Sequence, residues 1–352
     1  MDKLLEIKNV SKHFGGGFLS RKPINVAIDD ISLSIDAENP TITAIAGESG
    51  SGKTTLARLM LGFTDPTLGS VNYQGRDVQD MSSDQRTQFR REVQPIFQDP
   101  FEVFNPFYRV DHVMEMPIKM YGLADSKEDA KRMIVESLEM VGLRPGETLG
   151  RFPHQLSGGQ RQRIMVARAL MLRPKLIMAD EPVSMVDASL RATILGSLKK
   201  FNEELGISIV YITHDLTTAY QICENIIILY KGRVAEAGPV DKVIKDPKHP
   251  YTQLLVSSIP LPNPDTPWGG GQRVVTQAAD STTKGCLFAS RCAAVMPKCR
   301  EQVPDRFLPD SDRTAACFLH EDNPSMSNPD IASLLSAGKN NKVETASSSP
   351  AS

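Results

Sequence analysis

The sequence predicts an α/β fold with crossover helices, and two observations support this prediction. From Leu4 to about Asp246, short β-rich runs alternate with segments of helical pattern, as in a mostly parallel sheet covered by helices. In addition, a glycine-rich loop at Gly47–Thr54 lies between one such strand and one such helix. The chain has 352 residues, of which 40% are hydrophobic, and this length is typical of about two globular domains.

The individual elements follow from β-rich runs and from apolar residues at helical spacing. The expected strands are Leu4–Val10, Thr41–Ala46, Lys175–Asp180, Ile207–Thr213 and Asn225–Tyr230. The expected helices are Lys53–Leu61, Lys127–Val141, Gly158–Leu172, Ser189–Leu205 and Leu216–Cys223. Between Asp99 and Gly150 the pattern is mainly helical, which indicates a helical insertion.

Composition excludes several classes of function. The net charge of −2 and the pI of about 6.3 argue against a strongly basic nucleic-acid-binding protein. No apolar run approaches the roughly 18 residues of a membrane span. Charged residues interrupt the first ten positions, so no signal peptide is expected there,. We therefore expect a cytoplasmic protein that binds no nucleic acid and reaches a membrane only through a partner.

The glycine-rich loop matches the P-loop pattern G-x-x-x-x-G-K-T, and its flanking strand and helix are those that the motif needs. Its glycines allow backbone N–H groups to turn toward phosphates, and the following helix N-terminus favours anions. Lys53 is expected to reach the β- and γ-phosphates of ATP, and the Thr54 hydroxyl is expected to bind Mg²⁺. The predicted nucleotide-binding residues here are Gly47, Glu48, Ser49, Gly50, Ser51, Gly52, Lys53, Thr54 and Thr55.

A second acidic element lies downstream. The apolar run Leu176–Asp180 ends in a carboxylate and is followed directly by Glu181. Asp180 is suited to orient the Mg²⁺ shell, and Glu181 is suited to polarise an attacking water. Viewed alone, the run also fits a buried strand that ends at the surface. Its pairing with an upstream P-loop favours the catalytic interpretation.

The run Leu156–Arg163 reads LSGGQRQR and precedes Asp180. Viewed alone, it fits an ordinary helix cap equally well, because serine is a good N-cap residue. In this order after a P-loop it resembles the signature motif of ATP-binding-cassette (ABC) ATPases. The resemblance covers Leu4 to about Asp246 and implies that the signature residues bind nucleotide. These residues are Ser157, Gly158, Gly159 and Gln160.

Further parts of the family pattern occur in the same order. Gln98 resembles the glutamine of the Q-loop, Asp187 the aspartate of the D-loop and His214 the histidine of the H-loop. Phe14 resembles the aromatic residue that stacks on adenine. The resemblance implies a catalytic set of Glu181, His214 and Gln98. It also implies Mg²⁺ ligation by Thr54, Gln98 and Asp180.

In that family two cassettes form a head-to-tail sandwich, in which the P-loop of one and the signature helix of the other enclose each ATP. This chain has one cassette. The resemblance therefore implies a second ABC ATPase subunit, which we expect to be a paralogue in a heterodimer.

Two segments indicate a particular branch of the family. Lys248–Leu255 is similar to the H-P-Y-T segment of oligopeptide and dipeptide importer ATPases, and Gly285–Cys317 resembles their C-terminal region. The resemblance implies an F-type ATPase subunit of a peptide importer, with two membrane permease subunits and an extracytoplasmic substrate-binding protein. It implies a peripheral place on the cytoplasmic face of the inner (plasma) membrane. Import of oligosaccharide or nickel stays open, and so does a soluble, non-transport ABC ATPase.

Three regions are expected along the chain. Residues 1–246 form the nucleotide-binding domain, with a helical subdomain at about 99–170. Residues 247–320, broken by prolines, form a small irregular domain. Residues 321–352 are rich in serine and poor in aromatic residues, and are expected to be a disordered tail,.

The small C-terminal domain contains four of the five cysteines: Cys286, Cys292, Cys299 and Cys317. A disulfide framework is not expected in a cytoplasmic protein. Four thiolates are able to hold Zn²⁺ or a [4Fe–4S] cluster, and four ordinary thiols fit the spacing as well. The family resemblance favours the [4Fe–4S] cluster, with Zn²⁺ as the alternative. The fifth, Cys223, is expected to be a core thiol.

Overall fold

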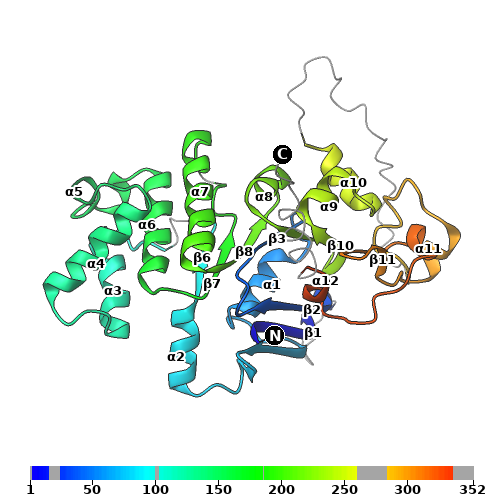
Figure 1. Cartoon of the computed structure of the whole chain (residues 1–352), viewed down its shortest axis with the longest axis horizontal. Helices are drawn as coiled ribbons and strands as arrows, with labels where there is room; N and C mark the ends of the chain where they lie inside the picture. The colour runs from blue at the N-terminus through cyan, green and yellow to red at the C-terminus, as the bar shows by residue number, and fades with distance from the viewer. Residues whose placement is uncertain (1, 16–23, 100–102, 185, 260–283, 336–352) are drawn as a thin grey trace, which may run out of the picture. The chain divides into compact units, whose positions relative to one another are not determined.

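The computed structural model describes residues 2–15, 24–99, 103–184, 186–259 and 284–335. They divide into two compact units. The first takes in residues 1–37, 43–79 and 213–352, and the second takes in 38–42 and 80–212. The P-loop therefore belongs to the first unit and the helical insertion to the second (Figure 1).

The first unit contains an antiparallel sheet in the order β2-β1-β4-β5. Its strands are β1 (Lys3–Phe14), β2 (Asn25–Asp36), β4 (Leu68–Tyr73) and β5 (Arg76–Asp77). β1 continues beyond the expected end at Val10, because the polar residues that follow still pair with β2 through several register shifts. Leu5 and Ile7 of β1 are buried, whereas Lys8 is exposed.

A second sheet in this unit holds the P-loop strand. β3 (Ile42–Ala46) runs parallel to β9 (Asn225–Tyr230), and both are buried along their whole length. β10 (Arg233–Pro239), β12 (Arg313–Ala315) and β11 (Phe307–Asp310) follow in antiparallel order. The helices are α1 (Lys53–Met60), α8 (Leu216–Ile222), α9 (Val240–Lys245), α10 (Pro250–Ser257), α11 (Pro297–Glu301) and α12 (Ala332–Leu335).

The second unit combines three parallel strands with a group of helices. The strands are β6 (Val93–Ile96), β7 (Leu176–Asp180) and β8 (Ser208–Thr213). The helices are α2 (Ser83–Glu92), α3 (Val110–Tyr121), α4 (Lys127–Met140), α5 (Pro145–Thr148), α6 (Gly158–Met171) and α7 (Ala188–Leu205). No helix in the described parts of the chain is long and apolar enough to cross a membrane.

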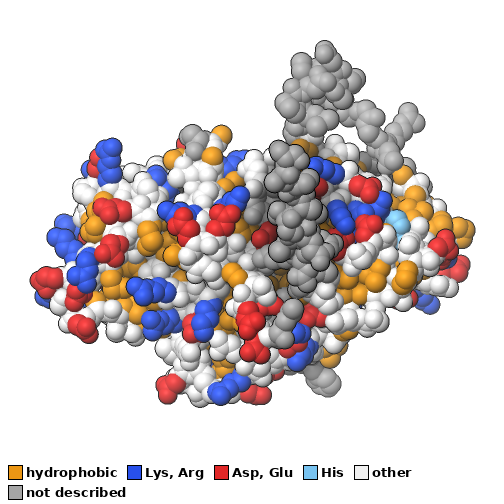
Figure 2. Space-filling model, viewed as in Figure 1, with side chains coloured by type: hydrophobic (Ala, Val, Ile, Leu, Met, Phe, Trp, Pro, Cys, Tyr) orange, Lys and Arg blue, Asp and Glu red, His pale blue; other side chains and the backbone are white. Residues whose placement is uncertain are grey.

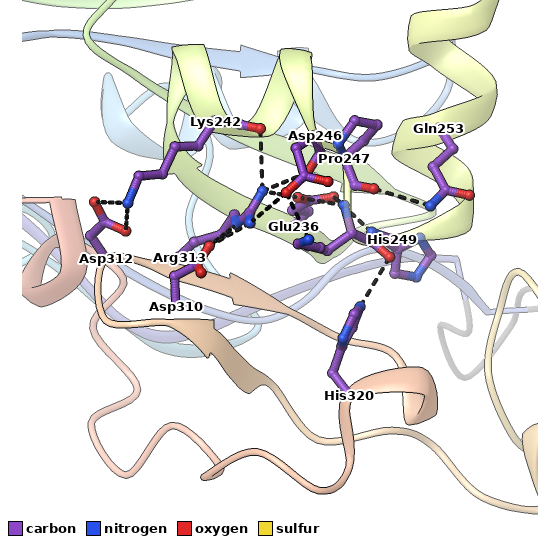
Figure 3. Close-up of polar contacts among 11 residues, drawn as sticks. Glu236, Lys242, Asp246, Pro247, His249, Gln253, Asp310, Asp312, Arg313 and His320 are labelled. Atoms are coloured by element: carbon purple, nitrogen blue, oxygen red, sulfur yellow. Dashed lines mark hydrogen bonds and ion pairs between the residues drawn. The ribbon is translucent and has the colours of Figure 1, made fainter.

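The C-terminal segment begins at residue 246. A buried polar network joins its residues 246–249 and its strand β12 to β10 (Figure 3). Glu236 of β10 is 0% exposed, and its carboxylate accepts the backbone N–H of Lys248 at 3.0 Å and of His249 at 2.8 Å. Arg313 of β12 is 2% exposed; its Nη1 lies 3.9 Å from Glu236 and donates to the carbonyl of Asp246 at 2.6 Å. β12 thereby pairs with β10 across the boundary that was expected at Asp246.

The expectation of a disordered tail from Glu321 onward is wrong for residues 321–335. Asp330 accepts hydrogen bonds from the Lys3 ammonium at 2.8 Å and the Ser34 hydroxyl at 2.7 Å. Ile331 is fully buried, and Leu334 and Leu335 are largely so. A few apolar residues thus dock a segment whose serine-rich composition indicated disorder. The remainder of the tail, from Ser336, lies outside the described residues.

His249 gives this docking a pH dependence. Its Nδ1 accepts the Tyr251 N–H at 3.0 Å as the N-cap of α10, and burial lowers the pKa of the imidazole from 6.5 to about 4. Between these values the unfolded chain binds a proton that the folded chain does not. The free energy of unfolding should therefore fall by about 3 kcal/mol as pH falls from 6.5 to 4,. Urea unfolding across this range measures the slope.

His249→Asn is the matched control, because asparagine also caps a helix N-terminus but does not titrate. This variant should lose the additional slope between pH 6.5 and 4. An equally steep slope in the variant would contradict the assignment to His249.

Candidate functional site

The P-loop is shaped by its contacts with neighbouring main chain in the first unit. A Cβ atom at Gly47 would lie 2.3 Å from the Leu229 carbonyl oxygen, and one at Gly52 would lie 2.6 Å from the Ala27 oxygen. Gly52 also has a φ of +107°, which side chains disfavour,. The Gly232 N–H donates to Ser51 O at 2.8 Å. Glycine is therefore required at both ends of the loop.

Lys53 begins α1 and is buried. Its ammonium donates to the carbonyls of Gly47 at 2.8 Å and Glu48 at 2.9 Å, which places the cation across the loop. Thr54, the next residue, is exposed. A cation beside a helix N-terminus, followed by an accessible hydroxyl, is a donor set that fits a triphosphate and its Mg²⁺.

Two other predicted residues of the first unit are accessible. The Phe14 side chain is 45% exposed, and the Lys12 ammonium lies 5.2 Å from its ring centroid. His214 follows β8 directly and is exposed. Both side chains therefore reach the protein surface.

The second unit brings two predicted catalytic residues into contact. Gln98 follows β6, Glu181 follows β7, and the Gln98 amide donates to the Glu181 carboxylate at 2.9 Å. The parallel pairing of β6 with β7 explains this, because the carboxyl ends of both strands meet at one edge,. Glu181 has a φ of +45° and its N–H donates to Ile212 O at 2.9 Å. Strained backbone of this kind gathers at functional sites.

The signature residues form the start of α6. Ser157 is the N-cap, and its hydroxyl accepts the Gln160 N–H at 3.2 Å while the Gln160 side chain accepts the Ser157 N–H at 2.9 Å. Gln162, which was not predicted as functional, donates to Phe97 O at 3.2 Å and joins this helix to the segment that carries Gln98. Gly159 faces α7, where an added Cβ would lie 2.7 Å from a Leu190 methyl group.

Asp180 and Asp187 bracket a turn in the second unit. Asp180 ends β7 and Asp187 is the exposed N-cap of α7. The Asp187 carbonyl accepts the N–H groups of Leu190 and Arg191 at 3.0 and 2.9 Å. Asp180 is the last residue of the buried strand β7 and directly precedes Glu181.

Sequence reasoning missed two residues of the first unit that contact the P-loop. The Tyr251 hydroxyl accepts the Glu48 N–H at 2.8 Å, and Arg291 forms a two-pronged ion pair with the Glu48 carboxylate. Both residues lie in motifs that were recognised, H-P-Y-T and the cysteine segment. No sequence signal connects either motif with a loop more than 200 positions away.

These parts define a nucleotide-binding cassette of the P-loop class. Residues 28–184 match the model of the family described as ABC transporter, and residues 235–299 match the family described as oligopeptide/dipeptide transporter, C-terminal region. Relatives match nearly the whole chain. The di/tripeptide transport ATP-binding protein DppF of Pseudomonas aeruginosa is 36% identical over 91% of this chain and 99% of its own length.

The oligopeptide transport ATP-binding protein OppF of Salmonella typhimurium is 35% identical over 86% of this chain and 92% of its own length. Among solved structures, the ATP-binding cassette MJ0796, a dimer bound to ADP and Pi, has a TM-score of 0.60 and 33% identity. That match covers 67% of this chain and 98% of the solved one. The chain belongs to the ABC transporter family and is an ABC ATPase, which confirms the expected family and fold class.

The metal expectation for the cysteines is not supported. Cys286, Cys292, Cys299 and Cys317 all line one small pocket. However, within the described ranges no group of three or more His, Cys, Asp or Glu side chains is arranged to hold a metal ion. Burial also raises the pKa of the Cys317 thiol to about 11 and raises that of Cys286. The described residues therefore give no support for the expected iron–sulfur cluster or for zinc.

Cys223 lies outside this pocket, at the end of α8. It is buried, and burial raises the pKa of its thiol. It is a core thiol, as expected.

The capping box of α6 allows its structural and functional roles to be separated. Ser82 caps α2 with the same pair of hydrogen bonds, to Gln85. Ser157→Ala and Ser82→Ala should each destabilise the protein by about 1 kcal/mol. Only Ser157→Ala should also lower ATP hydrolysis, by about tenfold, if its hydroxyl binds nucleotide as the motif implies. Urea unfolding and ATPase rates measured on both variants test this.

Equal losses of ATPase activity in the two variants would show that α6 capping alone explains the effect.

Proposed function

We propose that this chain is the ATP-hydrolysing subunit of a binding-protein-dependent importer of peptides. The observation that carries the catalytic part is the contact between the side chains of Gln98 and Glu181 at the carboxyl ends of β6 and β7. It holds a carboxylate in a defined orientation, as a general base requires. Peptide as cargo is supported by relatives whose names refer to di/tripeptide and oligopeptide transport.

Within this proposal each side chain has a role that its position supports. The buried Lys53 and the N–H groups of the loop bind the β- and γ-phosphates, and Phe14 stacks on adenine. Glu181 takes the proton of the attacking water, and His214 contacts the γ-phosphate. Thr54, Gln98 and Asp180 would hold Mg²⁺, which would offset the negative charge of the phosphates. The signature residues and Asp187 serve the nucleotide of a second subunit.

The partners proposed are a second cassette, two permease subunits and an extracytoplasmic binding protein. A dimeric cassette among the similar solved structures supports the second cassette, which we propose to be a paralogue. Exposed apolar side chains of the helical region support the proposal that it is the docking surface for the permeases. Met120 on α3 is 70% exposed, Phe107 is 85% exposed, and Figure 2 shows hydrophobic side chains over α3 and α4. Apolar surface of this kind marks interaction sites.

We propose that the chain, docked in this way, is a peripheral subunit on the cytoplasmic face of the membrane. We also propose that residues 1–246 are the nucleotide-binding domain and that the segment from 247 is its importer-specific extension. The match of the C-terminal family model to residues 235–299 supports this division.

Glu181→Gln tests the assignment of the base. The amide keeps the shape of the side chain and an oxygen that accepts from Gln98, but it cannot take a proton. We expect kcat for ATP hydrolysis to fall by about 10²- to 10⁴-fold while the affinity for ATP is retained. Steady-state hydrolysis and nucleotide binding measure the two quantities.

Glu203→Gln, at an exposed pair with Lys199 on α7, is the matched control and should leave both quantities unchanged. Hydrolysis at the normal rate by Glu181→Gln would exclude Glu181 as the base.

The cargo is tested on the complex purified from native membranes together with its binding protein. Peptide mixtures should stimulate ATP hydrolysis, whereas oligosaccharide mixtures and Ni²⁺ should not. Stimulation by sugars or nickel alone would keep the mechanism and overturn the cargo. A complex without membrane subunits would overturn the importer and favour a non-transport ABC ATPase.

A further inference from the structure

Arg291 of the C-terminal segment forms an ion pair with Glu48, the second residue of the P-loop. Its Nη1 donates to Glu48 Oε2 at 2.8 Å and its Nη2 donates to Glu48 Oε1 at 2.7 Å. Parallel hydrogen bonds between a guanidinium and a carboxylate are the strong form of ion pair, because geometry and charge act together. The hydrogen bond to Arg291 also lowers the pKa of the Glu48 carboxyl, which is therefore charged at neutral pH.

The guanidinium is itself held in place by aromatic rings. It lies 5.6 Å from the ring centroid of Phe288 and 5.9 Å from that of Tyr230. Tyr230 and Phe288 meet edge to face at 5.3 Å, and each also packs on Tyr251. A planar cation over such rings loses little freedom when it binds a carboxylate. Arg291 is thus oriented by a ring of β9, Tyr230, and a ring of its own segment, Phe288.

The same P-loop residue is held a second time through its backbone. The Glu48 N–H donates to the Tyr251 hydroxyl at 2.8 Å, while its carbonyl accepts from the Lys53 ammonium at 2.9 Å. The Lys53 ammonium also contributes to the lowered pKa of the Glu48 carboxyl, so this negative charge lies near the cation that the phosphates of ATP must meet. Left without Arg291, this charge would compete for Lys53 and repel the triphosphate.

We propose that Arg291 is a positioning residue for the ATP site: it binds and neutralises the Glu48 carboxylate, so that Lys53 is available to the triphosphate. The inference rests on the proposed function, since it assigns Arg291 a part in ATP binding. It also gives the C-terminal segment, which lies beyond the residues matched by the ABC transporter model, a direct effect on the affinity of the cassette for ATP.

The test is the equilibrium affinity of the full chain for MgATP, with KM and kcat measured on the complex. Arg291→Ala should weaken ATP binding and raise KM by about tenfold, with kcat within about twofold at saturating ATP. The loss should shrink as salt is raised, because it arises from an uncompensated charge. Lys298→Ala removes an ion pair with Glu321 in the same segment and should leave the affinity unchanged.

The double variant is decisive. Adding Glu48→Gln to Arg291→Ala removes the exposed charge and should restore the affinity to within about threefold of the wild type. A merely structural role for Arg291 predicts no such rescue. If Arg291→Ala does not fold, Arg291→Gln keeps the packing against the rings and removes only the charge.

Wild-type affinity in the Arg291 variants, or a double variant as weak as Arg291→Ala alone, would overturn the proposal. So would a fall in kcat at unchanged KM. These outcomes differ from failure of the proposed function, which would appear in the wild-type complex as hydrolysis that no peptide stimulates.

Discussion

A carboxylate without access to water, that of Glu236, constrains how the first unit is assembled. Burial raises the pKa of Glu236, and the hydrogen bonds from the Lys248 and His249 N–H groups oppose this shift. A buried charge is tolerated only with its partners, and removal of one partner typically costs about 3–5 kcal/mol. The side chain therefore requires that β10, the turn at 246–249 and Arg313 of β12 remain together (Figure 3).

This requirement extends to the P-loop through a short series of contacts. The N–H of His249 is fixed by Glu236, and the imidazole of His249 caps α10. The next residue but one, Tyr251, is fully buried and bonds the Glu48 N–H with its hydroxyl. A step of two residues, from His249 to Tyr251, thus joins the buried carboxylate network to the loop expected to bind phosphate. The C-terminal segment is consequently part of the environment of the P-loop and not an appendage.

The sequence predicted those parts of the molecule whose signals are local. The strands that became β3, β7, β8 and β9 carry continuous apolar runs, and their bounds agree with the expectations to within one residue. Motifs with fixed spacing located Lys53, Ser157 and Glu181. β10 and β12 were missed, because polar residues such as Glu236 and Arg313 interrupt their apolar pattern. Glu236 and Arg313 are buried because they pair with each other, although they are 77 residues apart in the chain.

The missed contacts of the candidate site have the same origin. The hydrogen bond between Gln98 and Glu181 follows from two parallel strands, and a parallel pairing is foreseeable once both strands are recognised. The ion pair between Glu48 and Arg291 spans 243 positions and depends on where Tyr230, Phe288 and Tyr251 gather. Only the assembled core determines that place.

The two units differ in which residue adopts a positive φ at the functional site. In the first, strain is avoided by glycine: Gly52 adopts a left-handed φ at the start of α1 without the cost that a side chain would add,. In the second, Glu181 carries a φ of +45° although it has a side chain. The cost of such a conformation is about 1–3 kcal/mol. Two hydrogen bonds offset this cost: the Glu181 N–H donates to Ile212 O, and the Ser184 N–H donates to Glu181 O. Glycine would relieve the strain but would remove the carboxylate that Gln98 orients. The strain at Glu181 is therefore a consequence of placing a charged side chain directly at the end of a buried strand.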